Sequence, residues 1–128
     1  MYKNFIALGS LLAALAVVLG AFAAHALKTR LTADSLAVFE TAVRYQMYHA
    51  FAIIIVGILH KEFPSKNILL AGKLFLWGII LFSGSLYMLT FIKAIESINF
   101  LWVGAFTPLG GACFIGGWVV IYLGIKKK

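Results

Sequence analysis

Several polar and ionisable side chains lie close together in the stretch FETAVRYQMYHAF, residues 39–51, within an otherwise apolar part of the chain. Glu40, Arg44 and His49 are its ionisable members. Histidine titrates near neutral pH and suits proton transfer, and an arginine with a carboxylate suits a charged headgroup or an ion relay. The stretch therefore raises the question of which chemistry a hydrophobic segment needs here.

Helical spacing sorts these side chains into two neighbouring strips. At 100° per residue the strips follow an i, i+4 pattern and consist of Glu40–Arg44–Tyr48 and Thr41–Tyr45–His49. Residues at this spacing are neighbours, so Glu40 can pair with Arg44, and Arg44 can reach the Tyr48 hydroxyl. Gln46 falls on another face of the same helix.

Composition indicates that lipid surrounds most of this chain. Of its 128 residues, 63% are hydrophobic and only 12% are charged, whereas a soluble domain carries about a quarter charged residues. The net charge of +7 comes from basic residues near the ends of apolar runs and from the C-terminal KKK. This distribution fits topology signals and anionic headgroups, and it argues against nucleic acid as a partner.

Sequence motifs for metal, phosphate or nucleophilic chemistry do not accompany the polar stretch. There is no CxxC, no HExxH and no Gly-rich phosphate loop after a strand. The single cysteine, Cys113, lies in an apolar run and fits a small packing residue. We therefore assign no catalytic residue, no metal ligand and no cofactor from the sequence.

Four apolar runs are long enough to cross about 30 Å of hydrocarbon. They cover about residues 5–27, 38–60, 68–91 and 101–125. The first resembles a signal peptide, but it exceeds the usual length of about 7–15 apolar residues, so we expect a retained helix. Short links predict an all-α integral membrane protein, an antiparallel four-helix bundle with up-down-up-down order that forms one domain over residues 1–128.

Basic residues predict the orientation of the bundle. Seven lysines fall on the side of the N-terminus, namely Lys3, Lys61, Lys66, Lys73 and Lys126 to Lys128. The opposite side receives Lys28, Arg30 and Lys93. The positive-inside rule then places both termini in the cytoplasm.

Two local features of the spans carry further expectations. Residues 31–39 either form a short amphipathic helix along the outer interface or extend the second span, with Thr32 or Asp34 as the N-cap. Ala16, Gly20 and Ala24 recur every fourth residue on the first helix, which favours close packing within the bundle over a dedicated dimer face.

Depth separates the polar residues of the second span. By helical rise, His49 lies about 18 Å and Arg44 about 25 Å from Lys61, so His49 is inside the hydrocarbon and Glu40 is near the outer interface. Polar residues of the other spans reach a similar level, and Pro108 predicts a local kink. We expect an outward-half polar pocket formed by Glu40, Arg44, Tyr45, Tyr48, His49, Ser83, Ser85, Tyr87, Thr107 and His25.

A purely structural interpretation accounts for the same residues. Arg44 can snorkel to the outer headgroups with Glu40 as its partner, while the tyrosines join the interfacial belt. His49 can donate one hydrogen bond to Ser83 or Ser85. His25 stands at a helix end, where a structural role is common.

Several segments together resemble a known family. GAFAAHALK, LAVFETAVRYQMYHAFAIIIVG, LFSGSLY and FTPLGGACFIGGW are similar to the small multi-pass family of unknown function that includes bacterial YgdD and YwdK and eukaryotic transmembrane protein 256. The resemblance covers essentially the whole chain and implies four spans in a bacterial cytoplasmic (inner) membrane, with no established activity. Ala23 stands where the family is expected to have glycine. The matching motif positions are Glu40, Arg44, Tyr45, Gln46, Tyr48, His49, Ser83, Ser85, Tyr87, Thr107 and Pro108.

Three functions stay open at this point. The first is a non-enzymatic module whose pocket binds a lipid headgroup, a small amphiphile or a partner helix, which makes membrane lipids, a homo-oligomer or another membrane protein the candidate partners. The second is an oligomeric proton- or ion-coupled transporter or channel, although the inner half offers almost no polar lining. The third is an enzyme acting on a lipid or quinone, with His49 as acid or base.

Overall fold

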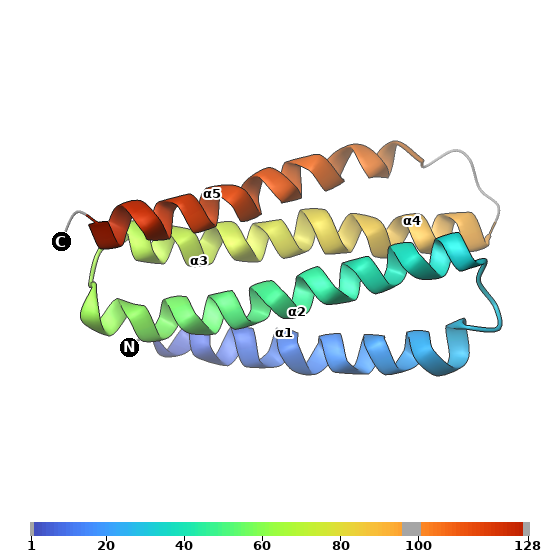
Figure 1. Cartoon of the computed structure of the whole chain (residues 1–128), viewed down its shortest axis with the longest axis horizontal. Coiled ribbons are helices and arrows are strands. Elements are labelled where there is room, and N and C mark those ends of the chain that lie inside the picture. Colours follow the sequence, from blue (N-terminus) through green and yellow to red (C-terminus); the bar gives the residue numbers. More distant parts are fainter. Residues whose placement is uncertain (1, 96–100, 127–128) are drawn as a thin grey trace.

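Every regular element of the described chain is helical. The computed structural model describes residues 2–95 and 101–126, shown in Figure 1. The elements are α1 (Lys3–Phe22), η1 (Ala23–Leu27), α2 (Ala33–Glu62), α3 (Lys66–Gly78), η2 (Ile79–Ser83), α4 (Gly84–Ala94), η3 (Leu101–Ala105) and α5 (Phe106–Lys126). Four continuous helical stretches are long and apolar enough to cross a membrane, which are Lys3–Leu27, Ala33–Glu62, Lys66–Ala94 and Trp102–Lys126. The prediction of an all-helical protein is confirmed, and four of its helical stretches have the predicted length and apolar character of spans.

Side-chain caps define where the second and third spans begin. Thr32 Oγ1 accepts a hydrogen bond of 3.1 Å from the backbone N–H of Ser35, and Ser65 Oγ accepts one of 3.3 Å from Ile68. The second span therefore starts at Ala33, and residues 33–39 are its first two turns. The alternative of a separate interfacial helix over residues 31–39 is wrong, because the Thr32 cap starts one unbroken helix.

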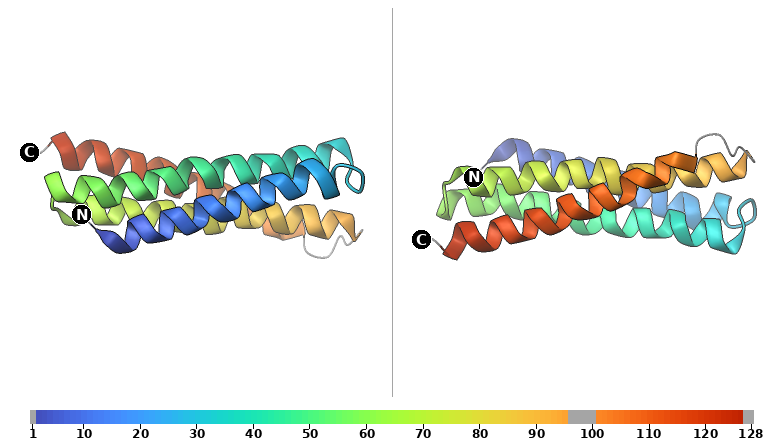
Figure 2. Two further views of the ribbon diagram at one scale, coloured as in Figure 1. Left: turned by 90° about the horizontal axis from the view of Figure 1, so that it is seen from below. Right: turned by 90° about the horizontal axis from the view of Figure 1, so that it is seen from above.

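The second and third spans are the central pair of the molecule, and the first and fourth flank them. In the most apolar part of each span, 44% of the second and 39% of the third is buried, against 17% for each of the other two. Figures 1 and 2 show α1 lying along α2, and α5 lying along α3. The apolar core between them includes Ile53, Val56, Ile68, Phe75 and Phe114. Large parts of α1 and α5 consequently face outward.

Small residues bring α1 and α2 into close contact. A Cβ atom on Gly9 would lie 2.7 Å from the carbonyl oxygen of Ala50, and one on Gly57 would lie 2.9 Å from the carbonyl oxygen of Tyr2. Neither position therefore accepts a side chain without movement of a backbone. The start of α1 also meets the end of α2 through a 2.8 Å hydrogen bond from Tyr2 N–H to the Gly57 carbonyl.

The buried small residues of the first span recur every seventh residue. Gly9, Ala16 and Ala23 are buried, whereas Ala24 is exposed and Gly20 is only half-buried. The predicted four-residue repeat of Ala16, Gly20 and Ala24 is therefore wrong at Ala24, while Gly20 faces Val43 of α2 without being fully buried. Seven-residue spacing keeps one seam against a neighbouring helix over several turns, which a four-residue repeat does not. Ala23 is 1% exposed, so its methyl group fits where the family is expected to carry glycine.

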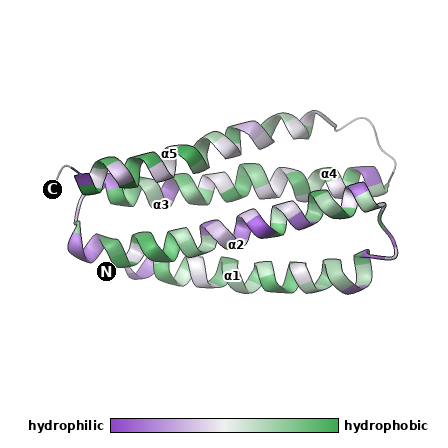
Figure 3. Ribbon diagram, viewed as in Figure 1, coloured by the Kyte–Doolittle hydropathy of each residue, from purple (hydrophilic) through white to green (hydrophobic). Residues whose placement is uncertain are grey.

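Irregular turns occur where the spans carry polar residues. η2 is a π-helical turn within the third span and ends at Ser83. Figure 3 shows hydrophilic positions inside α2 away from its ends, while α1 and α5 are apolar through most of their length. Pro108 lies in the first turn of α5, directly after the 3₁₀ turn η3. The first turn of a helix has no N–H partners within the helix, so the missing N–H of Pro108 costs no hydrogen bond there. The irregular backbone near Pro108 is the change from the 3₁₀ turn to the α-helix, and a kink stays a prediction.

Candidate functional site

Buried polar side chains gather in the half of the bundle that contains the α1–α2 link. They are Ser35, Gln46, His49, Ser83, Ser85 and Thr90. Within the described residues, no buried side-chain nitrogen or oxygen lacks a hydrogen-bond partner. Since an unpaired polar group in hydrocarbon is costly, the partner of each group indicates what that group does.

The two ring nitrogens of His49 bond to one hydrogen-bond acceptor and one hydrogen-bond donor. Its Nδ1 lies 2.8 Å from the Tyr45 carbonyl oxygen, and the Trp118 indole N–H donates to its Nε2 at 3.2 Å. A carbonyl only accepts and an indole N–H only donates, so the ring carries its proton on Nδ1. The ring also stacks on Phe114, with centroids 3.6 Å apart and planes 8° apart. The predicted hydrogen bond from His49 to Ser83 or Ser85 is wrong, because Tyr45 and Trp118 occupy both nitrogens.

Like Trp118, Gln46 was not included in the predicted pocket, and it joins three helices. Its Nε2 donates to the Leu12 carbonyl of α1 at 2.9 Å, and its Oε1 accepts from the Tyr87 hydroxyl of α4 at 2.7 Å. The side chain is 2% exposed. The prediction that Gln46 lies on a different face of α2 from the two polar strips is confirmed. That face points into the interior of the bundle. A signal was available, since an amide this deep in a span needs partners on other helices.

The predicted serines and threonine also bond within the bundle. Ser83 is fully buried and donates to the Ala42 carbonyl at 2.7 Å, which joins η2 to α2. Ser85 donates to the Phe82 carbonyl at 2.9 Å and forms a short hydroxyl–hydroxyl contact with Thr107 of α5. These hydroxyl groups connect neighbouring helices, and their donors are already used.

The first polar strip lies on the exposed face of α2. Glu40 and Arg44 are exposed, and Tyr48 is 54% exposed. Within the described part of the chain no ion pair joins Glu40 to Arg44, and the one hydrogen bond of the guanidinium runs from Nη2 to Thr41 Oγ1 at 3.2 Å. The predicted contacts of Arg44 with Glu40 and with the Tyr48 hydroxyl are therefore wrong, because the side chain turns toward Thr41.

Tyr45 marks the boundary between the exposed strip and the interior. It is 37% exposed, and its ring lies 4.7 Å from that of Phe82 and 5.8 Å from that of Tyr48. His25 lies on the exposed surface of η1 and has no hydrogen bond to the described residues. The structure thus divides the predicted cluster into a bonded interior group and an exposed group on α2, with His25 apart from both.

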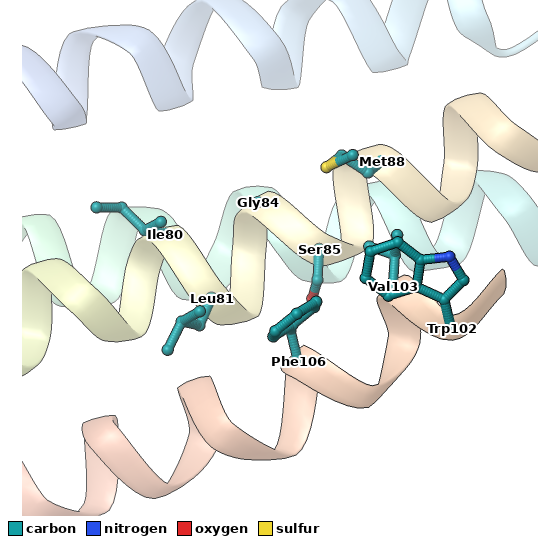
Figure 4. A pocket seen from close by; sticks show the side chains of 8 residues that line it. All are labelled: Ile80, Leu81, Gly84, Ser85, Met88, Trp102, Val103 and Phe106. Atoms are coloured by element: carbon teal, nitrogen blue, oxygen red, sulfur yellow. The ribbon is translucent and has the colours of Figure 1, made fainter. Parts of the chain in front are cut away.

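A cavity of about 450 Å³ lies between α4 and the start of the fourth span. Figure 4 shows its lining, which consists of Ile80, Leu81, Gly84, Ser85, Met88, Trp102, Val103 and Phe106. Ser85 is the one predicted site residue among them. The lining is otherwise apolar, so this cavity does not have the polar character that the sequence predicted for a pocket in this half.

No group of three or more His, Cys, Asp or Glu side chains within the described ranges is placed to hold a metal ion. The described residues also show no nucleophile paired with a base, since the one buried histidine is occupied by a carbonyl and an indole. The arrangement instead combines interhelical hydrogen bonds with one open polar face.

The fold and the site define a multi-pass helical membrane protein. The chain belongs to the family described as protein of unknown function (DUF423), whose model matches residues 19–111. It is 44% identical over 125 residues to a UPF0382 membrane protein of Staphylococcus saprophyticus, with 98% of each chain covered.

Other relatives are equally full-length. The UPF0382 membrane protein YwdK of Bacillus subtilis is 43% identical over 126 residues and is covered to 98%, as is this chain. A UPF0382 membrane protein of Staphylococcus haemolyticus is 42% identical over 125 residues, with 98% of this chain and 97% of the relative covered. No solved structure matches the chain. These relatives confirm the family and its membrane character, and they assign no activity.

Proposed function

We propose that this protein is a non-enzymatic module of the bacterial cytoplasmic membrane that binds a phospholipid headgroup on the exposed outward-half face of α2. In this proposal the spans alternate up-down-up-down as one domain, and both termini are cytoplasmic. In and near the links and chain ends, seven basic residues fall on the terminal side against three on the other, and this excess supports that orientation. The binding face then belongs to the outer leaflet.

The guanidinium of Arg44 is the observation that carries the proposal. It is exposed within an apolar span, and one of its five N–H donors is used, by Thr41. Side chains of a helix lean toward its N-terminus, and the N-terminus of α2 is at the outer side in the proposed orientation. Arg44 therefore extends toward the headgroups, where a phosphate can accept two of its N–H groups.

Glu40 adds a preference among headgroups. It is exposed one helical turn above Arg44, and the two side chains form no ion pair with each other. A zwitterionic headgroup can satisfy both, with its phosphate at Arg44 and its ammonium group at the Glu40 carboxylate. We therefore expect an amine-bearing phospholipid to be retained more strongly than a lipid with the same phosphate and no amine.

Two features weigh against the transporter and the enzyme. Both nitrogens of His49 are engaged by groups that cannot exchange roles, since an indole N–H does not accept and a carbonyl does not donate. The other half of the bundle is packed with apolar residues such as Ile53, Val56 and Phe75, which offer no polar path. Lipid binding requires neither a proton path nor an activated nucleophile.

Native mass spectrometry of the purified full-length chain, titrated with phosphatidylethanolamine and phosphatidylglycerol, tests the proposal. Arg44→Gln should raise the Kd for phosphatidylethanolamine by at least about tenfold, because a charge-assisted contact to the phosphate is lost. Glu40→Gln should raise the Kd for phosphatidylethanolamine about threefold and leave phosphatidylglycerol unchanged.

Arg30→Gln is the matched control, because Arg30 is another exposed arginine at the same end of the molecule. It should leave both affinities within about twofold, as expected for a charge outside the binding face. If Arg30→Gln and Arg44→Gln lost the same lipid affinity, the effect would come from the overall charge of the protein, and the proposal would be overturned. Unchanged binding by Arg44→Gln would overturn it as well.

A further inference from the structure

A second basic feature lies at the opposite end of the bundle, on the outward-facing surface of α3. A groove of about 450 Å³ is lined by Lys66, Asn67, Leu69, Leu70 and Lys73. It lies near the α2–α3 turn, at the end of the molecule where Figure 1 places the N- and C-termini. It shares no residue with the exposed face of α2.

Two lysines line one side of this groove. They are seven residues apart, so they share one side of the helix with their Cα atoms separated by about 10 Å along its axis. Side chains lean toward the helix N-terminus, and a lysine within hydrocarbon extends its ammonium group toward the nearer surface. In the proposed orientation the N-terminus of α3 lies at the nearer surface, so both ammonium groups extend toward the headgroups there.

Among the described residues, no carboxylate lines this groove, and neither Lys66 nor Lys73 forms an ion pair with them. The start of α3 adds the partial positive charge of a helix N-terminus, where Ser65 already caps Ile68. Two like charges that line one groove without a carboxylate repel each other, so an anion beside them is favourable.

The remaining lining residues specify what kind of anion fits. Leu70 is 44% exposed and lies one turn from Lys66, and Leu69 is partly buried beside it. Together they provide the apolar part of the groove that the two lysines also line. A free phosphate gains nothing from that surface, whereas an acyl chain attached to a phosphate covers it.

We propose that the Lys66–Lys73 groove is a binding site for an anionic phospholipid in the leaflet on the side of the chain termini. The phosphate lies between the two ammonium groups, and an acyl chain lies along Leu69 and Leu70. Binding there is independent of Arg44, because the two sites lie at opposite ends of the bundle and face opposite leaflets.

Lipid titration of the full-length chain in neutral nanodiscs tests this site. Phosphatidylglycerol and cardiolipin are added separately to the Arg44→Gln chain, which lacks the headgroup site proposed on α2, and binding is measured by native mass spectrometry. In that chain Lys66→Gln and Lys73→Gln should each raise the Kd about fivefold, and both together more than about tenfold, as expected for losing one interfacial cation at a time.

Lys61→Gln is the matched control, since Lys61 is an exposed lysine at the same end of the molecule and outside the groove. It should change the Kd by less than about twofold. A loss as large as that of Lys73→Gln would show that net charge alone attracts the lipid and would overturn the proposal. Inorganic phosphate should not compete at millimolar concentration, and competition at that level would overturn the assignment to a lipid.

Circular dichroism of each variant shows whether the substitutions leave the helices intact. All three lysines are exposed, so the helical content should match that of the wild type. If the chain with both lysines replaced folded and bound anionic lipid as its Arg44→Gln parent does, the groove would not be the site.

Discussion

At the scale of single residues, the hydrogen-bond partners of His49 determine its protonation state. A donor-only indole and an acceptor-only carbonyl leave one arrangement, with the proton on Nδ1. The ring is 5% exposed and stacks on Phe114, so it connects α2 to α5 without offering a free nitrogen. A residue that the sequence presents as a candidate acid or base is therefore arranged as a structural contact.

This arrangement predicts a specific spectrum for His49. In ¹⁵N NMR of the isotope-labelled protein at neutral pH, Nδ1 should be protonated and Nε2 unprotonated. Trp118→Phe should lower the free energy of unfolding by about 0.5–1.5 kcal/mol, because it removes one interhelical hydrogen bond in a membrane protein. Unfolding in mixed detergent measures this change.

Trp77→Phe provides the comparison for that substitution. Trp77 is 56% exposed and has no hydrogen bond to the described residues, so its replacement should leave the unfolding free energy nearly unchanged. A proton found on Nε2 would contradict the assigned tautomer, and equal effects of the two substitutions would contradict the hydrogen bond from Trp118 to His49.

Residue-level prediction from the sequence succeeded for one helix face and failed for the partners. Helical spacing placed Gln46 on a face apart from Glu40 and Arg44, as the structure does, because a face depends only on spacing along one helix. It could not show that Gln46 meets Leu12 and Tyr87, since those partners come from helices whose rotation about their own axes is set by packing. Trp118 was missed for the same reason, as its indole reaches His49 from a different span.

At the scale of the elements, glycine positions determine how closely α1 and α2 approach. A Cβ atom at Gly9 would lie 2.7 Å from the carbonyl oxygen of Ala50, which belongs to the α2 backbone and cannot rotate away. At Gly20 the nearest atom would be a methyl group of Val43 at 3.4 Å, an ordinary van der Waals contact. The two glycines lie on the same helix and face the same neighbour.

Alanine substitution should therefore have different effects on stability at these two glycines. Gly9→Ala should destabilise the protein by about 1–3 kcal/mol, because the helices must move apart. Gly20→Ala should stay within about 0.5 kcal/mol of the wild type, since the methyl group has room and alanine favours helix. Unfolding in mixed detergent measures both, and equal effects would contradict the close approach at Gly9.

Element boundaries followed from local sequence, whereas the packing seam did not. Thr32 was expected as an N-cap and is one, because capping depends on neighbours in the chain. The seam of Gly9, Ala16 and Ala23 differs from the expected four-residue repeat. A small-residue pattern is compatible with several crossing geometries, and the partner surface selects among them.

At the scale of the whole molecule, polarity is divided between the two ends of the bundle. Buried hydrogen-bonded residues such as Gln46 and Ser83 lie in the half with the α1–α2 link, and the apolar core around Ile53 and Ile68 lies in the other. Basic residues are concentrated beyond the apolar half. Such a molecule has a strongly preferred orientation in a bilayer, because the charged end resists translocation.

Cysteine labelling in intact bacterial cells tests that orientation. Cys113 is the one cysteine of the chain, so Cys113→Ser provides a background for Thr29→Cys in the α1–α2 link and Pro64→Cys in the α2–α3 turn. Thr29 and Pro64 are both exposed. A membrane-impermeant maleimide should label Thr29→Cys in intact cells and Pro64→Cys only after lysis. The reverse pattern would show that the protein has the opposite orientation and would place each proposed lipid site in the other leaflet. Labelling of both cysteines in intact cells would contradict a single orientation.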